Sequence, residues 1–340
     1  MARRGHELLI AAPPQSRIYA EGKKRGMAVH ALPIARKSLA GFFALRALLK
    51  AEAVQIVNTH SSTDSWLAAL ACLGLSNAPA VVRTRHISAP IPRNAGTRWL
   101  YKRAASFVVT TGEALRRQVI EETGTDPSRV VSVPSGIDLE HFRPGDRNAM
   151  RAVLGLPEKG FVVGIVATLR SWKGHRFLLD AIAGIEDPNV KTVIVGTGPG
   201  ENNLRRQIEK FGLADRVIMA GQQDDVVPWL QSFDVFALPS YANEGVPQAI
   251  MQAMACGLPV ITTPVGAISE AARDGVTALM VPPQDADALA AAILRLYGDR
   301  GLCERMGSAA LAEAQARFAE ALMLDAMERV FSAAAPGATA

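Results

Sequence analysis

The sequence predicts an α/β protein of two domains, each built on a parallel sheet. Apolar runs of strand length alternate with helix-length segments along nearly the whole chain, and such βα alternation is typical of parallel sheets covered by helices. A length of 340 residues allows two domains that each bury a core. A segment with Pro and Gly, 142–146, precedes a helical segment, Arg147–Leu154, and is the predicted linker.

These signals predict elements and boundaries. We expect Rossmann-like domains at 1–145 and 146–315, facing each other across a ligand cleft, followed by a terminal helix and tail in 316–340. Alanine and leucine recur with helical spacing through 309–334, which predicts one long helix there. The expected strands are 7–11, 55–59, 79–84, 106–110, 130–133, 161–167, 190–195, 217–219, 234–238, 259–262 and 278–281.

The composition favours a cytoplasmic protein. Hydrophobic residues make up 49% of the chain and charged residues 20%, and the longest apolar run, Trp66–Leu75, is about half of the ~20 residues that a membrane span needs. The first residues hold too few apolar positions for a secretory signal. The three cysteines are widely separated and fit neither a zinc site nor a disulfide framework.

The chain is basic, with a net charge of +5 and a sequence pI near 9.3. Basic residues gather at Arg3–Arg4, at Lys23–Arg25 and between Arg83 and Arg103. Nucleic acid is not an expected partner, because no binding motif or interleaved aromatic residues accompany them. Some of these basic residues are expected to face solvent only. For the others, the favoured partner is an anionic membrane surface, on the inner face of the cytoplasmic membrane.

Residues 240–262 carry the most informative pattern. Strand-like runs flank a short helical segment in which Pro247 suits the first helical position and Gly257 suits a cap with φ > 0. Glu244 and the N–H groups of Gly245 and Val246 then lie between a strand's carboxyl end and a helix's amino end, where phosphates bind in open α/β sheets. A carboxylate beside such a site suits a ligand with phosphate and hydroxyl groups, as in a sugar nucleotide.

This stretch resembles the signature of retaining glycosyltransferases of the two-domain GT-B fold, family 4 (glycosyl transferases group 1). The resemblance implies that Glu244 holds the donor sugar and that the second family glutamate, here Gln252, holds the ribose. It also implies a terminal helix that crosses back to the first domain. The implied donor-binding residues of this stretch are Gly245, Val246, Pro247, Gln248 and Gln252.

Two further segments extend the resemblance on the donor side. Thr168–Lys173 is similar to the family segment whose Arg and Lys neutralise the diphosphate; Lys173 matches, Thr168 stands at the Arg position, and Arg170 supplies the second charge. Gly196–Gly198 resembles a turn that lets the backbone approach the nucleotide. A dinucleotide-binding fingerprint is disfavoured there, because position 201 is Glu instead of Gly.

Two histidines follow strands of the first domain. His86 resembles the family histidine that contacts the donor sugar near the reacting carbon, and with Glu244 it is the implied catalytic residue. His60 is a weaker candidate, and we interpret His6, His30, His141 and His175 as structural. No carboxylate pair or Asp-x-Asp arrangement is visible, so we expect no metal and no cofactor.

The beginning of the chain departs from the family pattern. Arg4–His6 matches the end of the family's first helix, so the first βα unit with its Gly-rich loop is expected to be missing, which would leave backbone groups unpaired along 55–59 or a neighbour. Near 134–138 the chain resembles the turn before the linker, and Gly136 is expected to supply a positive φ.

The resemblance implies transfer of a sugar from a nucleotide-sugar donor to a hydroxyl of a lipid-linked or cell-envelope glycan acceptor, with retention, as in lipopolysaccharide or polysaccharide biosynthesis. Two alternatives stay open: a sugar-nucleotide epimerase of the same fold, and a catalytically impaired, truncated remnant.

Overall fold

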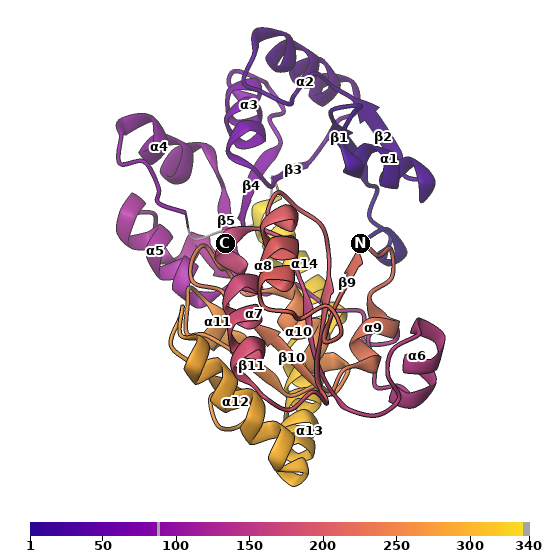
Figure 1. Ribbon diagram of the computed structural model, residues 1–340. Coiled ribbons are helices and arrows are strands. Elements are labelled where there is room, and N and C mark those ends of the chain that lie inside the picture. The colour runs from indigo at the N-terminus through magenta and orange to yellow at the C-terminus, as the bar shows by residue number, and fades with distance from the viewer. Residues whose placement is uncertain (87–88, 336–340) are drawn as a thin grey trace. The chain divides into compact units, whose positions relative to one another are not determined.

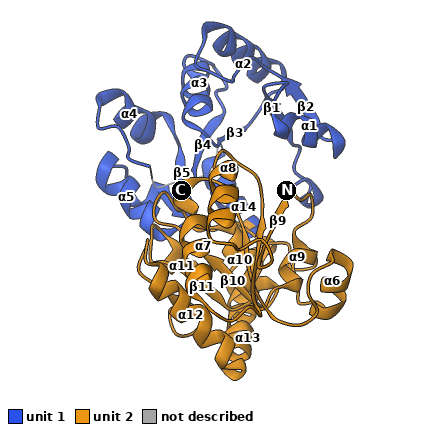
Figure 2. Cartoon of the chain, viewed as in Figure 1, with its two compact units in different colours: residues 1–133, 324–340 blue, residues 134–323 orange. Residues whose placement is uncertain are grey.

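The computed structural model describes residues 1–86 and 89–335; the end of the expected tail, 336–340, lies outside them. The chain forms two compact units (Figures 1 and 2): unit 1 comprises 1–133 and 324–340, and unit 2 comprises 134–323. The segment 142–146 therefore belongs to unit 2. All strand ladders of the described residues are parallel, which confirms the predicted α/β class.

Unit 2 is built around a six-stranded sheet in the order β12-β11-β10-β7-β8-β9. Its strands are β7 Phe161–Val166, β8 Val190–Val195, β9 Val217–Gly221, β10 Val235–Leu238, β11 Val260–Thr262 and β12 Ala278–Met280. The chain runs outward from β7 in one direction and from β10 in the other, so the strand order reverses between these two neighbours. In open α/β sheets, ligands bind outside the carboxyl ends of the strands at such a switch point.

Helices cover this sheet and bury its apolar strands. They are α6 Arg147–Leu154, α7 His175–Gly184, α8 Glu201–Lys210, α9 Val227–Ser232, α10 Gln248–Ala255, α11 Ile268–Ala271, α12 Ala286–Gly298 and α13 Arg300–Arg317. α6 has the predicted bounds, and Asp146 caps it by accepting bonds from its first N–H groups. α10 begins one residue later than predicted, because Pro247 is its N-cap and not its first helical residue, whereas Gly257 has the predicted positive φ, 78°.

The single helix predicted for 309–334 is wrong. Two helices occupy it, α13 and α14 (Glu320–Ala334), because Ile137 pairs with the chain between them: its N–H donates to Phe318 O (2.7 Å) and its carbonyl accepts from Glu320 N (3.0 Å). The expected positive φ at Gly136 is also wrong, since that residue is not among the positive-φ glycines. A Cβ there would lie 2.6 Å from the Cα of Glu320, so the glycine permits this close packing.

The expected return of the terminal helix to the first domain is confirmed. α14 begins in unit 2, and from Leu324 onward its residues cluster with unit 1. Arg4 Nη1 lies 2.7 Å from both Asp325 and Glu328 carboxylate oxygens, and His6 Nε2 lies 2.9 Å from Glu328. The Arg-Gly-His segment at the start of the chain is therefore held against this helix.

Unit 1 contains a four-stranded sheet, β3-β4-β5-β6, and a separate two-stranded sheet, β1-β2. Its elements are β1 Leu9–Ala12, α1 Arg17–Lys24, β2 Ala28–Ala31, α2 Leu39–Ala51, β3 Ile56–Thr59, α3 Ser62–Cys72, β4 Ala80–Arg85, α4 Ala95–Trp99, β5 Phe107–Thr110, α5 Glu113–Thr123 and β6 Val130–Ser132. β2 was not predicted, because its half-exposed residues lack a strong apolar run. Among the described strands β3 pairs with β4 alone, leaving its other edge unpaired, as expected for 55–59.

Candidate functional site

The candidate site lies where the loops after β7 and β10 meet. Tyr241 N donates to Trp172 O at 2.9 Å, which joins the two loops directly. Gly174 ends the first loop with φ 78°, and a Cβ at this position would lie 1.9 Å from Pro239 O. Only glycine fits this approach without moving the backbone. The Lys-Gly pair of the sequence motif thus has a packing reason as well as a chemical one.

Lys173 and Glu244 form an ion pair at this junction. Lys173 Nζ lies 2.7 and 3.0 Å from the two carboxylate oxygens of Glu244, and Ser240 Oγ donates to the nearer oxygen at 2.6 Å. The side chain of Glu244 is 5% exposed and that of Lys173 is 20% exposed. Two residues that sequence motifs assigned separately to the donor are therefore in direct contact.

The amino end of α10 adjoins Glu244. Its N-cap, Pro247, provides no side-chain cap, and no acceptor for the N–H groups of Gln248 and Ala249 is found among the described residues. Such free N–H groups, with the helix dipole, favour an anion. Gln248 and Gln252 lie one turn apart on α10, the first exposed and the second half-buried, and neither side chain makes a hydrogen bond within the described chain. Gly245 and Val246 connect Glu244 to this helix.

The other predicted donor-binding residues surround this junction less closely. Thr168 and Arg170 are exposed in the loop after β7, and the Arg170 guanidinium lies 5.1 Å from the centre of the Trp172 ring. Gly198 packs against the same loop, where a Cβ would lie 2.8 Å from Leu169 N. The contact between the loops that follow β7 and β8 is therefore enough to require glycine at position 198, with or without a nucleotide nearby.

His175 is a feature that the sequence interpretation missed. It opens α7 directly after Gly174, is 2% exposed, and neither ring nitrogen has a hydrogen-bond partner within the described chain. Burial, helped by the nearby charge of Lys173, lowers its pKa to about 4. The ring is therefore neutral at physiological pH. The sequence signal for His175 was its position directly after Lys173 and Gly174, but this position did not indicate that the ring is buried.

In unit 1, His60 and His86 follow the adjacent strands β3 and β4 and contact each other. His60 Nδ1 lies 3.0 Å from His86 Nε2, and Asp64 accepts a bond from His60 N at 2.9 Å. Desolvation lowers the pKa of both rings, and the charge of His60 lowers that of His86 further. At neutral pH the pair can share one proton, with one ring donating and the other accepting.

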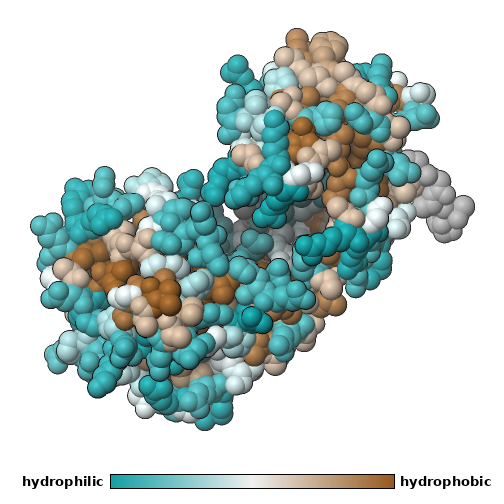
Figure 3. Space-filling model, turned by 90° about the vertical axis from the view of Figure 1, so that its right-hand side faces the viewer, coloured by the Kyte–Doolittle hydropathy of each residue, from teal (hydrophilic) through white to brown (hydrophobic). Residues whose placement is uncertain are grey.

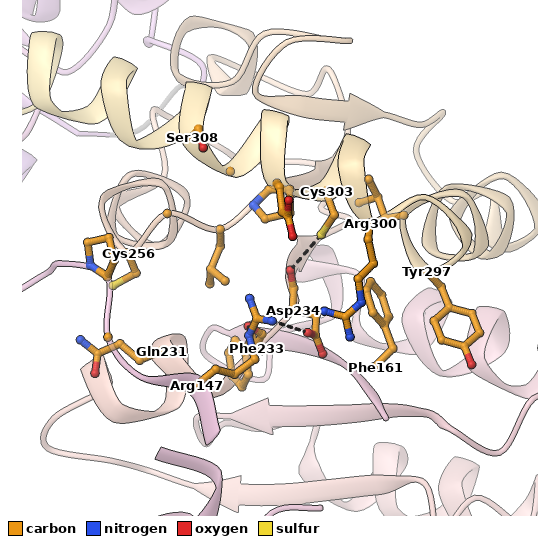
Figure 4. Close-up of a pocket in the computed structure, with 18 of the residues that line it drawn as sticks. Arg147, Phe161, Gln231, Phe233, Asp234, Cys256, Tyr297, Arg300, Cys303 and Ser308 are labelled. Carbon is orange, nitrogen blue, oxygen red and sulfur yellow. Dashed lines mark hydrogen bonds and ion pairs between the residues drawn. The ribbon is translucent and has the colours of Figure 1, made fainter. Parts of the chain in front are cut away.

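A cavity of about 610 Å³ opens at the opposite edge of the unit 2 sheet (Figure 4). It borders the residues at or just before the amino ends of the strands, such as Phe161, Asp234 and Pro259. Figure 4 shows Arg147 directed at Asp234, at 3.0 Å, and Arg151 binds the same carboxylate at 2.5 Å. None of the predicted site residues lines this cavity. The residues that sequence motifs predicted for the donor lie at the carboxyl edge instead, so the carboxyl edge remains the candidate site.

Within the described residues no group of three or more His, Cys, Asp or Glu side chains is arranged to hold a metal ion. Burial raises the thiol pKa of Cys72 and Cys303 to about 11 and that of Cys256 to about 12. None of the three is a reactive thiolate at neutral pH.

Known protein families match this chain along most of its length. The description "Glycosyltransferase Family 4" matches residues 1–141, and "Glycosyl transferases group 1" matches residues 146–312. The D-inositol 3-phosphate glycosyltransferase of Nocardia farcinica is 35% identical over 257 residues, which cover 72% of this chain and 56% of that protein. The protein of the same name from Mycobacterium tuberculosis (strain H37Ra) is 32% identical, covering 96% of this chain and 75% of that protein.

Solved structures share the fold. A glycosyltransferase from Rickettsia africae has a TM-score of 0.86 at 20% identity, covering 97% of this chain and 91% of its own. HepE from Anabaena in complex with UDP has a TM-score of 0.85 at 24% identity, covering 95% and 91%. Sucrose-phosphate synthase from Thermosynechococcus elongatus has a TM-score of 0.82 at 23% identity, covering 96% and 89%. This chain belongs to the group 1 glycosyl transferases of family 4, with the GT-B fold of two Rossmann-like domains.

Proposed function

We propose that the protein moves a sugar from a nucleotide-sugar donor to a hydroxyl of an acceptor, with retention at the anomeric carbon. The observation that carries the proposal is the Lys173–Glu244 ion pair beside the uncapped amino end of α10. A cation, a carboxylate and free N–H groups meet at the switch point of the sheet. This combination suits a ligand that joins a diphosphate to a sugar.

The charges suggest how the donor lies. The diphosphate accepts hydrogen bonds from Lys173, from the N–H group of Gln248 at the start of α10, and from those of Gly245 and Val246 just before Pro247. Arg170 and Thr168 adjoin it from the loop after β7, and Gly198 from the loop after β8. Negative charge grows on the diphosphate as the glycosidic bond breaks, and donors already in place stabilise it without reorganisation. The acceptor oxygen bonds to the anomeric carbon on the face from which the diphosphate leaves, which gives retention, and the leaving diphosphate oxygen takes the acceptor's proton.

In this proposal Glu244 and Gln252 bind different hydroxyl groups of the donor. Glu244 accepts hydrogen bonds from the sugar, with His86 as a second contact to it, and Gln252 binds the ribose. An amide lacks the charge-assisted bond of a carboxylate, which is about twice as strong. Gln252→Glu is therefore expected to tighten nucleotide binding, measured by calorimetry. Unchanged affinity would remove the ribose assignment.

For the acceptor we propose a lipid-linked or cell-envelope glycan, with the enzyme peripheral on the inner membrane face. Within the described residues, no helix combines the length and the apolar character that crossing a bilayer requires. A phosphorylated polyol is a second candidate acceptor, because the relatives described above are named for D-inositol 3-phosphate. UDP-glucose is the first donor to test, because HepE was also solved with that molecule.

The test is product formation from a panel of nucleotide sugars with lipid-linked glycans and polyol phosphates. The expected product is a glycosylated acceptor with the anomeric configuration of the donor, and Lys173→Met is the low-activity control. Isomer or free sugar formed equally well without acceptor would favour an epimerase. Nucleotide binding without turnover of any donor would favour the impaired remnant.

A further inference from the structure

The cavity beside the amino ends of the unit 2 strands has the size and the walls of a ligand site. Its volume of about 610 Å³ lies in the range of ~300–1,000 Å³ that is typical of small-molecule sites. Buried apolar side chains form part of its lining: Phe161, Leu258, Pro259 and Leu296. Cys303 and Ser308 line it from α13 (Figure 4). All of its lining residues belong to unit 2, and we call it the amino-edge cavity.

The amino-edge cavity holds more basic groups than carboxylates. Three basic side chains and two acidic ones line it: Arg147, Lys159, Arg300, Asp234 and Glu304. The carboxylate of Asp234 is bound by two arginines, Arg147 at 3.0 Å and Arg151 at 2.5 Å. Two guanidinium groups thus share one carboxylate. The lining of the cavity therefore carries a net positive charge.

Donor groups on these basic side chains remain available to a ligand. Arg147 uses Nε to bind Phe233 O and Nη1 to bind Asp234, and its Nη2 has no partner within the described residues. Arg300 extends from α13 into the cavity (Figure 4). Neither Arg300 nor Lys159 forms a hydrogen bond or ion pair with the described part of the chain. A guanidinium group matches the paired oxygens of a carboxylate or phosphate.

Exposed apolar side chains alone would not mark a site. On the face of the molecule that Figure 3 shows, brown patches lie among hydrophilic side chains, and scattered apolar exposure of this kind is normal. The amino-edge cavity differs because apolar walls and unpaired cations occur together in a hollow. This combination suits a ligand that has an apolar body and an anionic group.

We propose that the amino-edge cavity is a second ligand site, which binds a small organic anion: a carboxylate or a phosphate ester on an apolar body. Its oxygens accept hydrogen bonds from Arg147 Nη2, Arg300 and Lys159, and its body packs against Phe161. The cavity and the Lys173–Glu244 pair lie at opposite ends of the strands, so both ligands can bind at once. The proposal is independent of the glycosyltransferase assignment.

The test is titration of the full chain with phenyl phosphate, benzoate and benzyl alcohol, followed by NMR of the ring protons of each probe. At least one of the two anions should bind, and comparing them distinguishes a phosphate from a carboxylate ligand. Benzyl alcohol has the ring without the charge and should bind about tenfold more weakly or less, because it makes no charge-assisted hydrogen bond. Each titration is repeated with UDP, which should leave the affinity for the probe unchanged.

The cavity variant Lys159→Ala/Arg300→Ala should weaken binding of the anion by about tenfold or more. Both side chains are exposed, so the fold should be retained. The matched control, Arg295→Ala/Arg305→Ala, removes two exposed arginines of α12 and α13 that do not line the cavity. It should bind the anion as the parent does.

Absence of binding by both anions would overturn the proposal, and so would parental affinity in the cavity variant. An equal affinity for benzyl alcohol would show that the cations take no part. Displacement of the anion by UDP would place the probe at the donor site and would also overturn the proposal. Failure of UDP itself to bind would count against the proposed function and leave the probe titration unaffected.

Discussion

Replacing Lys173 separates two roles of the buried pair, folding and phosphate binding. Lys173→Met removes the ammonium group that lies 2.7 Å from the carboxylate of Glu244, whose side chain is 5% exposed. Breaking a buried pair costs about 3–5 kcal/mol, and because Lys173 itself is 20% exposed we expect the lower end, about 3 kcal/mol. For a domain of 150–250 residues this lowers Tm by about 6–12 °C.

The double variant Lys173→Met/Glu244→Gln should recover most of that stability, since no buried charge is then left unpaired. It should still bind UDP about 10–150-fold more weakly than the parent, because the charge-assisted phosphate contact is absent. Glu244→Gln alone should bind UDP as well as the parent or better, because Lys173 is released from the carboxylate. Thermal unfolding and calorimetry on the four proteins complete the cycle. Parental UDP affinity in the double variant would refute the phosphate role of Lys173.

Three further predictions concern stability. The unfolded chain protonates a histidine near pH 6.5, whereas the folded chain protonates His175 only near pH 4. The unfolded state therefore binds more protons between these pH values, and the free energy of unfolding falls by about 3 kcal/mol as pH drops through them. His175→Leu should remove this part of the pH dependence in urea unfolding at pH 7 and pH 4, and an unchanged pH dependence would contradict the assignment. Gly174→Ala should lower the melting temperature far more than Gly275→Ala. Both glycines have positive φ, but only at position 174 would a Cβ lie against a carbonyl oxygen, at 1.9 Å. Equal melting temperatures would show that the loop relaxes. Asp234→Ala should cost about 3–5 kcal/mol in chemical denaturation, because it leaves Arg151, 3% exposed, without its carboxylate, whereas a loss below 1 kcal/mol would mean that water reaches that arginine.

Local signals account for what the sequence predicted correctly. The alternating βα pattern, the bounds of α6 and the positive φ of Gly257 depend on residues within a few positions of one another, as caps and apolar periods do. β2 was missed because its four residues are half-exposed and lack a strong pattern. The break before α14 was missed because the cause, Ile137, lies far away in the sequence.

The sequence by itself determined the chemical groups of the proposed donor site, because Lys173, Glu244 and Pro247 stand in local motifs at the ends of strands and at the start of a helix. Only the tertiary structure decided that Lys173 and Glu244, 71 positions apart, neutralise each other. It also decided that His175 is buried, and that Arg83 is covered while Phe43 is exposed. Charge and hydropathy belong to each residue, but burial and pairing depend on which distant segments pack against it.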